Sequence, residues 1–288
     1  MLIIAWLKMG LYMNKTAIEQ GVTAHVCRVL SVKSLNPLSS INQGTFEIEL
    51  QSIEAAALSF QAGQYLELEL ELALEQALGQ GVNKDSQTHA LSYTIASRFN
   101  KEQPNCLKLI IQKNSAFSGK VVDRLKELSH NQDKVNITLA MGRAFLQTDL
   151  DLPHLLVAAG SGISKIKCIT EEILQKTPDA NVNIYWSNRN ADDFFLLNEF
   201  NDWAAQYKNL QFTPILESTA DNWFGPSGFI YQVIQKDFSD LTNMQTYLCG
   251  SPQMVYGTID QLTPLGLQEE NCYSDVFEFA PRDERVAV

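Results

Sequence analysis

The sequence lacks the residue patterns of metal and disulfide chemistry. Five cysteines occur among 288 residues, none in a Cys-x-x-Cys pair, and an odd number cannot all form disulfides. The four histidines lie far apart and form no pair at the spacing of metal ligands. We therefore expect reduced thiols, no structural zinc or iron–sulfur cluster, and no catalytic metal.

Long apolar runs and excess positive charge are also missing. The apolar opening, residues 1–7, ends at Lys8 and is far shorter than the roughly 20 residues that cross a bilayer. Residues 1–21 form an extension, of which 1–12 are either dispensable or a short interfacial anchor. Acidic residues outnumber basic ones by 33 to 22, which argues against binding to nucleic acid or to anionic membranes. We expect a cytoplasmic protein.

The acidic excess is confined to one part of the chain. Residues 1–150 hold 14 basic and 14 acidic side chains, whereas residues 151–288 hold 8 basic and 19 acidic ones. This asymmetry and the length favour two domains with different surfaces. An anionic ligand of the second part must be held by local groups, against the overall charge.

The first part has the alternating pattern of half-buried strands. We predict strands at residues 24–30, 45–50, 64–72, 91–97, 107–112 and 135–139. One helix is expected at residues 119–128, and residues 73–89 are expected to form a long loop. Strands at this spacing favour an antiparallel barrel over residues 22–148.

The second part, residues 149–288, alternates strands with helices. The continuous apolar run 154–159 is typical of a parallel strand buried on both faces. Further strands are predicted at residues 182–186, 211–216, 244–249 and 273–279. A helix is expected after each of these strands except the last, and also after the strand at 154–159. This order predicts a doubly wound, Rossmann-like sheet.

Four segments carry groups suited to ligand binding. Gly160, Ser161 and Gly162 stand between a strand and a helix, where glycines and free helix amides can face a pyrophosphate. Lys165 and Lys167 follow in the first helical turn, where a bound phosphate would offset their conflict with the helix dipole. A tight turn with two solvated lysines is the other interpretation.

The remaining three segments are weaker taken singly. Residues 93–97 offer an aromatic ring, hydroxyls and amides to a flat heteroaromatic ligand, or form an ordinary half-buried strand. Cys249 precedes a Gly-Ser-Pro helix start at the ligand-binding edge of the sheet, or is a buried structural cysteine. Residues 273–279 are aromatic, which core packing alone would also explain.

In this order the segments resemble the ferredoxin–NADP reductase superfamily, and within it the NAD(P)H:flavin reductases of the luciferase-associated type. The resemblance spans about residues 22–279. Its motifs are FQAGQY at 60–65, YTIAS at 93–97, VVDRL at 121–125, MGRAFL at 141–146, AAGSG at 158–162, IYWSNR at 184–189, CGSP at 249–252 and SDVF at 274–277.

The resemblance implies an antiparallel Greek-key barrel that binds flavin and an α/β domain that binds NADH or NADPH. Thr94 and Cys249 would lie at the site of hydride transfer, where the protein mainly orients two rings. The implied flavin-binding residues are Tyr93, Thr94, Ile95, Ser97, Ile110, Ile111, Gln112 and Lys113. The implied nucleotide-binding residues are Gly160, Ser161, Gly162, Ile163, Ser187, Arg189, Cys249, Gly250, Ser251 and Pro252.

One departure bears on the flavin. Leu91 stands where the family motif has an arginine that grips the flavin phosphate, so a bidentate clamp is missing. Either Lys113, Ser118 and Lys120 replace it, or the flavin is held through its ring and released.

Three functions are compatible with this pattern. The first is an enzyme that reduces FMN, FAD or riboflavin as a substrate and supplies a flavin-dependent monooxygenase. The second is an electron-transfer component with bound flavin that serves an oxygenase, iron–sulfur protein or metal complex. The third is a non-catalytic binding module that takes nucleotide and flavin only as ligands. The sequence leaves open the choice between NADH and NADPH and the oligomeric state.

Overall fold

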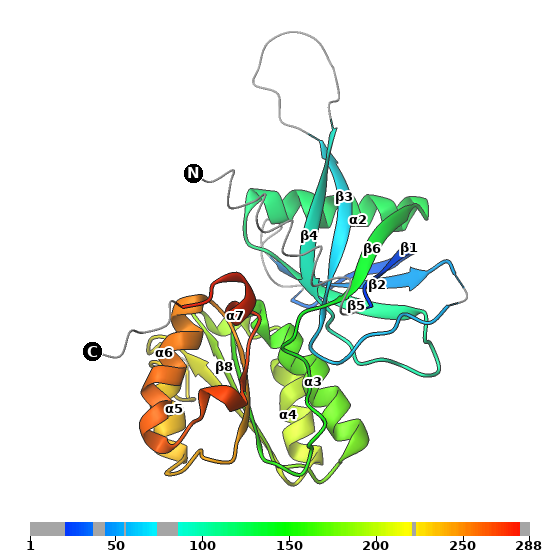
Figure 1. The fold of residues 1–288 in the computed structure, drawn as a ribbon. Coiled ribbons are helices and arrows are strands. Elements are labelled where there is room, and N and C mark those ends of the chain that lie inside the picture. The colour runs from blue at the N-terminus through cyan, green and yellow to red at the C-terminus, as the bar shows by residue number, and fades with distance from the viewer. Residues whose placement is uncertain (1–20, 37–43, 55, 74–85, 221–222, 283–288) are drawn as a thin grey trace.

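The structure is a computed structural model that describes residues 21–36, 44–54, 56–73, 86–220 and 223–282. Figure 1 shows two bodies joined by the chain that leaves strand β6, each built on its own sheet. The expected extension at residues 1–21 lies outside the described residues except for Gly21. Within the described residues, no helix is both long and apolar enough to cross a membrane.

The first body is a curled antiparallel sheet in the order β4-β3-β6-β1-β2-β5. An isolated bridge between Ile95 and Leu109 brings its two edge strands together, which confirms the expected barrel architecture. Its strands are β1 (Thr23–Ser34), β2 (Gly44–Ser52), β3 (Tyr65–Ala73), β4 (Ser86–Thr94), β5 (Cys106–Lys113) and β6 (Lys134–Met141).

Alternation places the barrel core. In β3 the leucines are buried while the glutamates between them are not, as a period of two requires. Helix α2 (Ala116–Asn131) adds Val121, Val122 and Leu125 to the same core. Ser115 caps this helix by accepting a hydrogen bond from the Ser118 backbone N at 3.1 Å.

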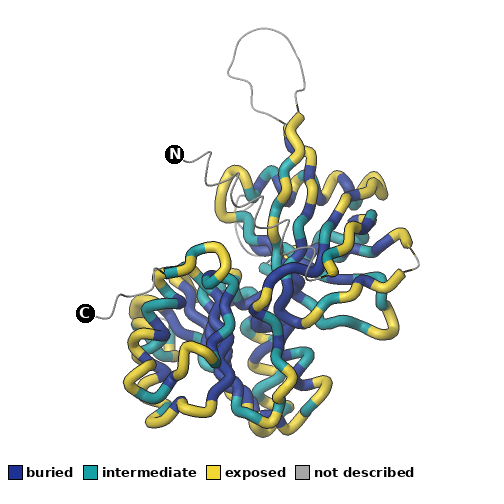
Figure 2. The backbone as a smooth tube through the Cα atoms, in the orientation of Figure 1, coloured by how far each residue is buried: buried dark blue, intermediate teal, exposed yellow. Residues whose placement is uncertain are grey.

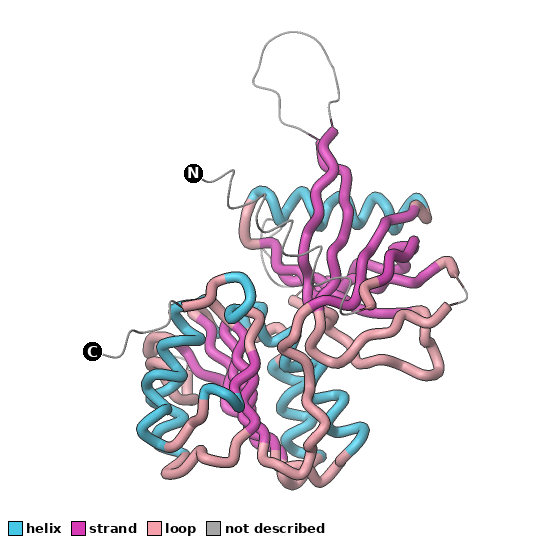
Figure 3. Tube along the Cα trace, viewed as in Figure 1, coloured by secondary structure: helices cyan, strands magenta, loops and turns pink. Residues whose placement is uncertain are grey.

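The second body is a parallel sheet covered by helices on both faces, as Figures 1 and 3 show. Its strand order is β11-β10-β7-β8-β9. The strands are β7 (His154–Ala159), β8 (Val182–Asn188), β9 (Leu210–Leu216), β10 (Gln245–Cys249) and β11 (Cys272–Tyr273). The helices are α3 (Ile163–Lys176), α4 (Leu197–Gln206), α5 (Ile230–Asp237), α6 (Pro252–Leu262) and the short α7 (Val276–Phe279).

Two hydrophobic layers hold this sheet. Ile166 of α3 and Phe200 of α4 pack on one face, and Val233 of α5 and Ile259 of α6 pack on the other. The strands between them are buried on both sides, which appears in Figure 2 as dark blue segments. Burial on both faces explains why β7 carries an uninterrupted apolar run.

Most predicted elements differ from the structure by a few residues at their ends, and three expectations differ more. The predicted strand at residues 273–279 is wrong, because pairing stops at Tyr273 and Val276–Phe279 is helical. Ser274 Oγ accepts a hydrogen bond from the Val276 backbone N at 3.3 Å, which starts that turn. The predicted loop at residues 73–89 extends too far, since β3 includes Ala73 and β4 begins at Ser86. The strand predicted at residues 91–97 ends at Thr94.

Buried His154 predicts that stability depends on pH. Burial lowers the pKa of His154 from 6.5 to about 4, so the unfolded chain binds the proton more readily. The free energy of unfolding should therefore fall as pH drops from about 6.5 to about 4, by about 3 kcal/mol from this group. Denaturant titrations of His154→Gln should lack this part of the slope, whereas variants of exposed His130 should keep it.

Candidate functional site

A cavity of about 1250 Å³ lies where the carboxyl edge of the parallel sheet meets the barrel. Its walls include the ends of β7, β8, β9 and β10, the starts of α3, α5 and α6, and Thr94, Gln112 and Asn114 from the barrel side. Open α/β sheets bind ligands at this edge. The volume exceeds that of a typical drug-sized pocket, so it has room for a dinucleotide beside a second ring.

The Gly-Ser-Gly segment forms the sharp turn that the sequence predicted. Gly160–Gly162 is a single 3-10 turn leading into α3, with Gly160 at a φ of +56°. The buried Trp186 holds it by donating its indole Nε1–H to the Gly160 carbonyl O at 2.9 Å. A Cβ atom at Gly162 would lie 2.5 Å from the Cys249 carbonyl O. The turn is therefore packed directly against the end of β10.

The two lysines of α3 are not solvated, so the second interpretation of them is wrong. Lys165 is 1% exposed, and its Nζ lies 3.0 Å from the Ala144 carbonyl O and 2.7 Å from the Asp275 carboxylate. Lys167 is also buried and is paired with Glu171 and Glu199. Although burial opposes the charged form, these two carboxylates raise the pKa of Lys167. Both cations therefore hold the fold, which leaves backbone amides to meet a pyrophosphate.

Most of the residues predicted for nucleotide binding gather in the cavity. Those that line it are Gly160, Ser161, Gly162, Ser187, Arg189, Cys249, Gly250 and Ser251. Ile163, the first residue of α3, is instead fully buried in the core, and Pro252 is the first residue of α6. Ser251 caps α6 by accepting a hydrogen bond from the Met254 backbone N at 3.2 Å.

Cys249 presents a neutral thiol to the cavity. It ends β10 and is 9% exposed. Burial raises the pKa of the Cys249 thiol to about 12, and nearby Lys165 only partly offsets this. A thiol that stays protonated near neutral pH is a soft, uncharged neighbour for a ring and a poor nucleophile.

Only part of the predicted flavin set lines this cavity. Thr94 and Gln112 do, whereas Tyr93 packs against the barrel core, where burial raises its pKa to about 12. The side chains of Ile95, Ile110 and Ile111 are buried. Lys113 Nζ lies 3.4 Å from the Asp123 carboxylate, and Ser97 Oγ accepts from the Lys108 backbone N at 3.0 Å.

The groups suggested as a phosphate clamp already have partners. Leu91 packs against the barrel core. Lys113 is paired with Asp123, and Ser118 and Ser115 cap each other at the start of α2. These contacts weaken the first interpretation of the missing arginine.

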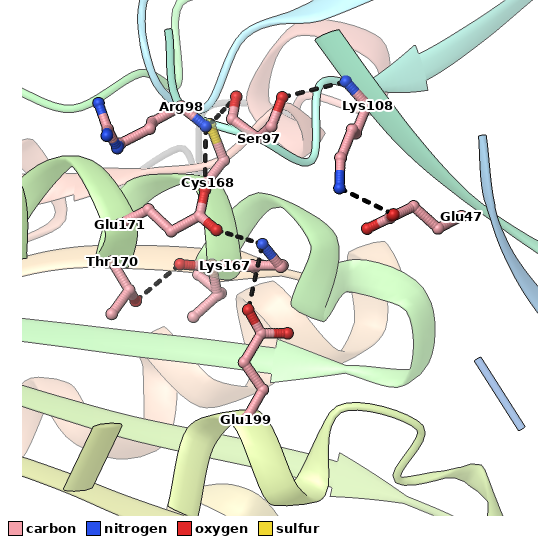
Figure 4. A network of polar contacts seen from close by, with 10 residues as sticks. Glu47, Ser97, Arg98, Lys108, Lys167, Cys168, Thr170, Glu171 and Glu199 are labelled. Atoms are coloured by element: carbon pink, nitrogen blue, oxygen red, sulfur yellow. Dashed lines mark hydrogen bonds and ion pairs between the residues drawn. The ribbon is translucent and has the colours of Figure 1, made fainter. Parts of the chain in front are cut away.

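A polar network beside a second, 520 Å³ cavity joins the two bodies. Figure 4 shows the Glu171 carboxylate of α3 between two donors. One oxygen accepts a hydrogen bond from Lys167 Nζ, and the other accepts one from the Arg98 backbone N at 3.0 Å. The Cys168 thiol donates to the Ser97 carbonyl O at 3.2 Å. Helix α3 thus bonds to the barrel at several points, which fixes the barrel wall of the first cavity relative to the Gly-Ser-Gly turn.

Asn188 and Glu217 are among the cavity residues that the sequence analysis did not name as site residues. Asn188 ends β8 and is 5% exposed, and its amide Nδ2 has no hydrogen-bond partner among the residues that the structure describes. Glu217 immediately follows β9 and is ion-paired with Arg189. Both positions could have been found from one rule, that residues ending adjacent parallel strands share an edge.

Known proteins with similar sequences are named as reductases, and one matching family model describes an oxidoreductase domain. Residues 156–259 match the family model of the oxidoreductase NAD-binding domain. The chain is 25% identical over 249 residues to the NAD(P)H-flavin reductase of Aliivibrio fischeri, covering 86% of this chain and 97% of that one. It is also 25% identical over 265 residues to the CDP-6-deoxy-L-threo-D-glycero-4-hexulose-3-dehydrase reductase of Yersinia pestis, covering 86% and 73%.

Solved structures agree on the fold. The Plasmodium falciparum ferredoxin-NADP+ reductase matches with a TM-score of 0.66 at 18% identity, covering 88% of this chain and 95% of that one. The cytochrome b5 reductase domain of Ulva prolifera nitrate reductase matches with a TM-score of 0.70 at 14% identity, covering 88% and 97%. These matches confirm the two-part architecture of a barrel followed by a parallel α/β sheet.

Proposed function

We propose that this chain, a relative of the ferredoxin–NADP reductase superfamily and of its flavin reductases, transfers hydride from NAD(P)H to a flavin that it then releases. One observation carries the proposal: a single cavity is lined by the Gly-Ser-Gly turn, by Cys249 and by Thr94 of the barrel. Its relative in Aliivibrio fischeri is named for this activity. We keep residues 22–148 and 149–288 as the proposed flavin and nucleotide domains.

The residues present fit these two groups. The Gly160–Gly162 turn offers amides at a helix start, and Asn188 offers a buried amide without a partner. When bound, the nicotinamide supplies a hydride and the flavin accepts it. Thr94 would donate a hydroxyl hydrogen bond to the flavin, and the neutral Cys249 thiol would border the nicotinamide. No strong acid or base is needed for this step, so the protein's contribution is orientation.

The loss of the motif arginine at Leu91 favours flavin as a substrate. Leu91 is apolar, Lys113 is paired with Asp123, and Ser118 is engaged in a cap. With no bidentate arginine, the ring supplies most of the binding free energy, which suits rapid release. Release would let the reduced flavin serve a flavin-dependent monooxygenase.

A second candidate is an electron-transfer component that retains its flavin. The Yersinia pestis relative is named as the reductase of a dehydrase, and an Amycolatopsis cytochrome P450 reductase shares the fold, with a TM-score of 0.68 at 21% identity, covering 88% of this chain and 69% of that one. Such a partner would hold its own redox centre. The acidic second half of this chain disfavours an equally acidic ferredoxin.

One experiment separates the candidates. The purified protein is examined by visible spectroscopy, and absorbance at about 340 nm is followed with NADH or NADPH, with and without riboflavin, FMN or FAD. Colourless protein that oxidises nucleotide only with added flavin would support the reductase. Yellow protein whose rate of nucleotide oxidation does not change when flavin is added would support the electron-transfer component. No oxidation of NADH or NADPH under any condition would contradict both candidates.

Thr94→Ala should lower kcat more than it raises the KM for nucleotide. Thr94 lies on the barrel wall of the cavity, and its loss removes a flavin contact while leaving the Gly-Ser-Gly turn intact. We expect about a 10- to 100-fold fall in kcat, the usual scale for a positioning hydrogen bond. Thr94→Ser, which keeps the hydroxyl, should restore most of the rate. Equal rates in all three proteins would remove Thr94 from the site.

A further inference from the structure

We propose that the far end of the cavity, beyond the Gly-Ser-Gly turn, selects NADH over NADPH, with Asn188 and Glu217 as the specificity-determining residues. This inference rests on the proposed function, because it concerns the hydride donor of the same site. The sequence analysis left the choice of nucleotide open, and it named Arg189 and Ser187 but neither of these two residues.

The backbone brings these two residues together where β8 and β9 end. Strands β8 and β9 are parallel neighbours, and Asn188 is in register with Leu216, the residue before Glu217. The Glu217 backbone N donates to the Asn188 carbonyl O at 3.0 Å, which extends the ladder by one step. Both residues also line the cavity, so a donor amide and an acceptor carboxylate border the same space from two adjacent strand ends.

The Asn188 amide is a buried hydrogen-bond donor that lacks an acceptor among the described residues. It is 5% exposed, and its Nδ2 is buried without a hydrogen bond. Buried polar groups in native proteins are nearly always bonded, and an orphaned one lowers stability. A ligand hydroxyl can accept this hydrogen bond while donating its own to a nearby carboxylate. A ribose with free 2′- and 3′-hydroxyls has that pair of groups.

The charges at this end oppose a 2′-phosphate. Glu217 and Asp193 contribute two carboxylates to the lining, against the single cation Arg189. Arg189 Nε already lies 3.3 Å from the Glu217 carboxylate, and the Arg189 side chain is 82% exposed. The other cation among the described lining residues, Lys165, is held by Asp275. A 2′-phosphate would bring nearly two negative charges beside the Glu217 carboxylate. It could pair with Arg189 only by breaking the Arg189–Glu217 ion pair.

The test measures binding rather than turnover. The full chain is titrated by calorimetry with ADP-ribose and with 2′-phospho-ADP-ribose, which probe this end without flavin or nicotinamide. We expect ADP-ribose to bind at least about 30-fold more tightly. Glu217→Gln should reduce the ratio of the two affinities at least about 10-fold, mainly because 2′-phospho-ADP-ribose would bind more tightly. Asn188→Ala should weaken ADP-ribose by about 5- to 10-fold.

A matched control removes a carboxylate elsewhere. Asp202→Asn alters an exposed carboxylate on α4, which contributes no residue to this cavity, and should leave the ratio unchanged. Tighter binding of the phosphorylated ligand, lost in Arg189→Gln, would overturn the proposal, as would a ratio insensitive to Glu217→Gln or binding of neither ligand. Selective ADP-ribose binding without hydride transfer to any flavin would instead refute the proposed function and leave this inference standing.

Discussion

Gly162→Ala is expected to lower the affinity for nucleotide at least about 100-fold and to destabilise the protein by about 1–3 kcal/mol. The backbone at Gly162 is ordinary, with φ −58° and ψ −18°, so the obstacle is purely steric. An added Cβ would lie 2.5 Å from the Cys249 carbonyl O and 2.9 Å from the Cys249 carbonyl carbon. Because these are backbone atoms, either the turn or the end of β10 must move, and both border the cavity.

Gly257→Ala is the matched control for that substitution. Gly257 also lines the cavity, but a Cβ there would meet no atom within 4 Å. It lies inside α6, where alanine is favoured over glycine by about 1 kcal/mol, so this variant should be slightly more stable. Denaturant unfolding and ADP-ribose titration compare the two. Normal binding by Gly162→Ala would show that the turn does not need its close contact with β10.

Asp275→Ala should destabilise the protein by about 3–5 kcal/mol, and more than Lys165→Met does. The reason is the unequal burial of the pair, in which the Lys165 side chain is 1% exposed and that of Asp275 is 25% exposed. Without Asp275, the buried ammonium keeps, among the described residues, the Ala144 carbonyl O as its one hydrogen-bond partner. Without Lys165, the carboxylate can still reach water, and methionine fills the space that the lysine stem occupied.

A double-mutant cycle measures this asymmetry. Denaturant unfolding of both single variants and of Lys165→Met with Asp275→Ala should show the double variant close to Lys165→Met alone. If Lys165→Met were the more harmful change, or the two effects simply added, the buried ion pair would not hold the fold in the way we infer.

Local patterns predicted most of the fold because burial in these elements follows sequence spacing. Alternation identified β3, and the unbroken apolar run identified β7 to the residue. The failure at residues 273–279 has a long-range cause: Asp275 is bonded to Lys165, which is 110 positions away in sequence, and the chain turns there. Aromatic residues favour strands locally, but this local preference contains no information about an ion pair with a residue far away in the sequence.

The candidate site was predictable where it depends on strand ends. The Gly-Ser-Gly turn, Arg189 and Cys249 follow three parallel strands and converge on one edge, as the topology requires. The barrel side was harder, because neighbours on a strand point to opposite faces. Thr94 reaches the cavity while Tyr93 packs on the core, a division that needs the register of the sheet.

The surplus of carboxylates around the cavity also affects how quickly a nucleotide can arrive. The part of the chain from residue 151 onward carries 19 acidic against 8 basic side chains, and an approaching pyrophosphate meets that repulsion before it reaches the amides of the Gly160–Gly162 turn. Salt shortens the range of such forces to about 10 Å at 0.1 M. Encounter should thus speed up as ionic strength increases, the reverse of the steering used by basic nucleotide-binding proteins.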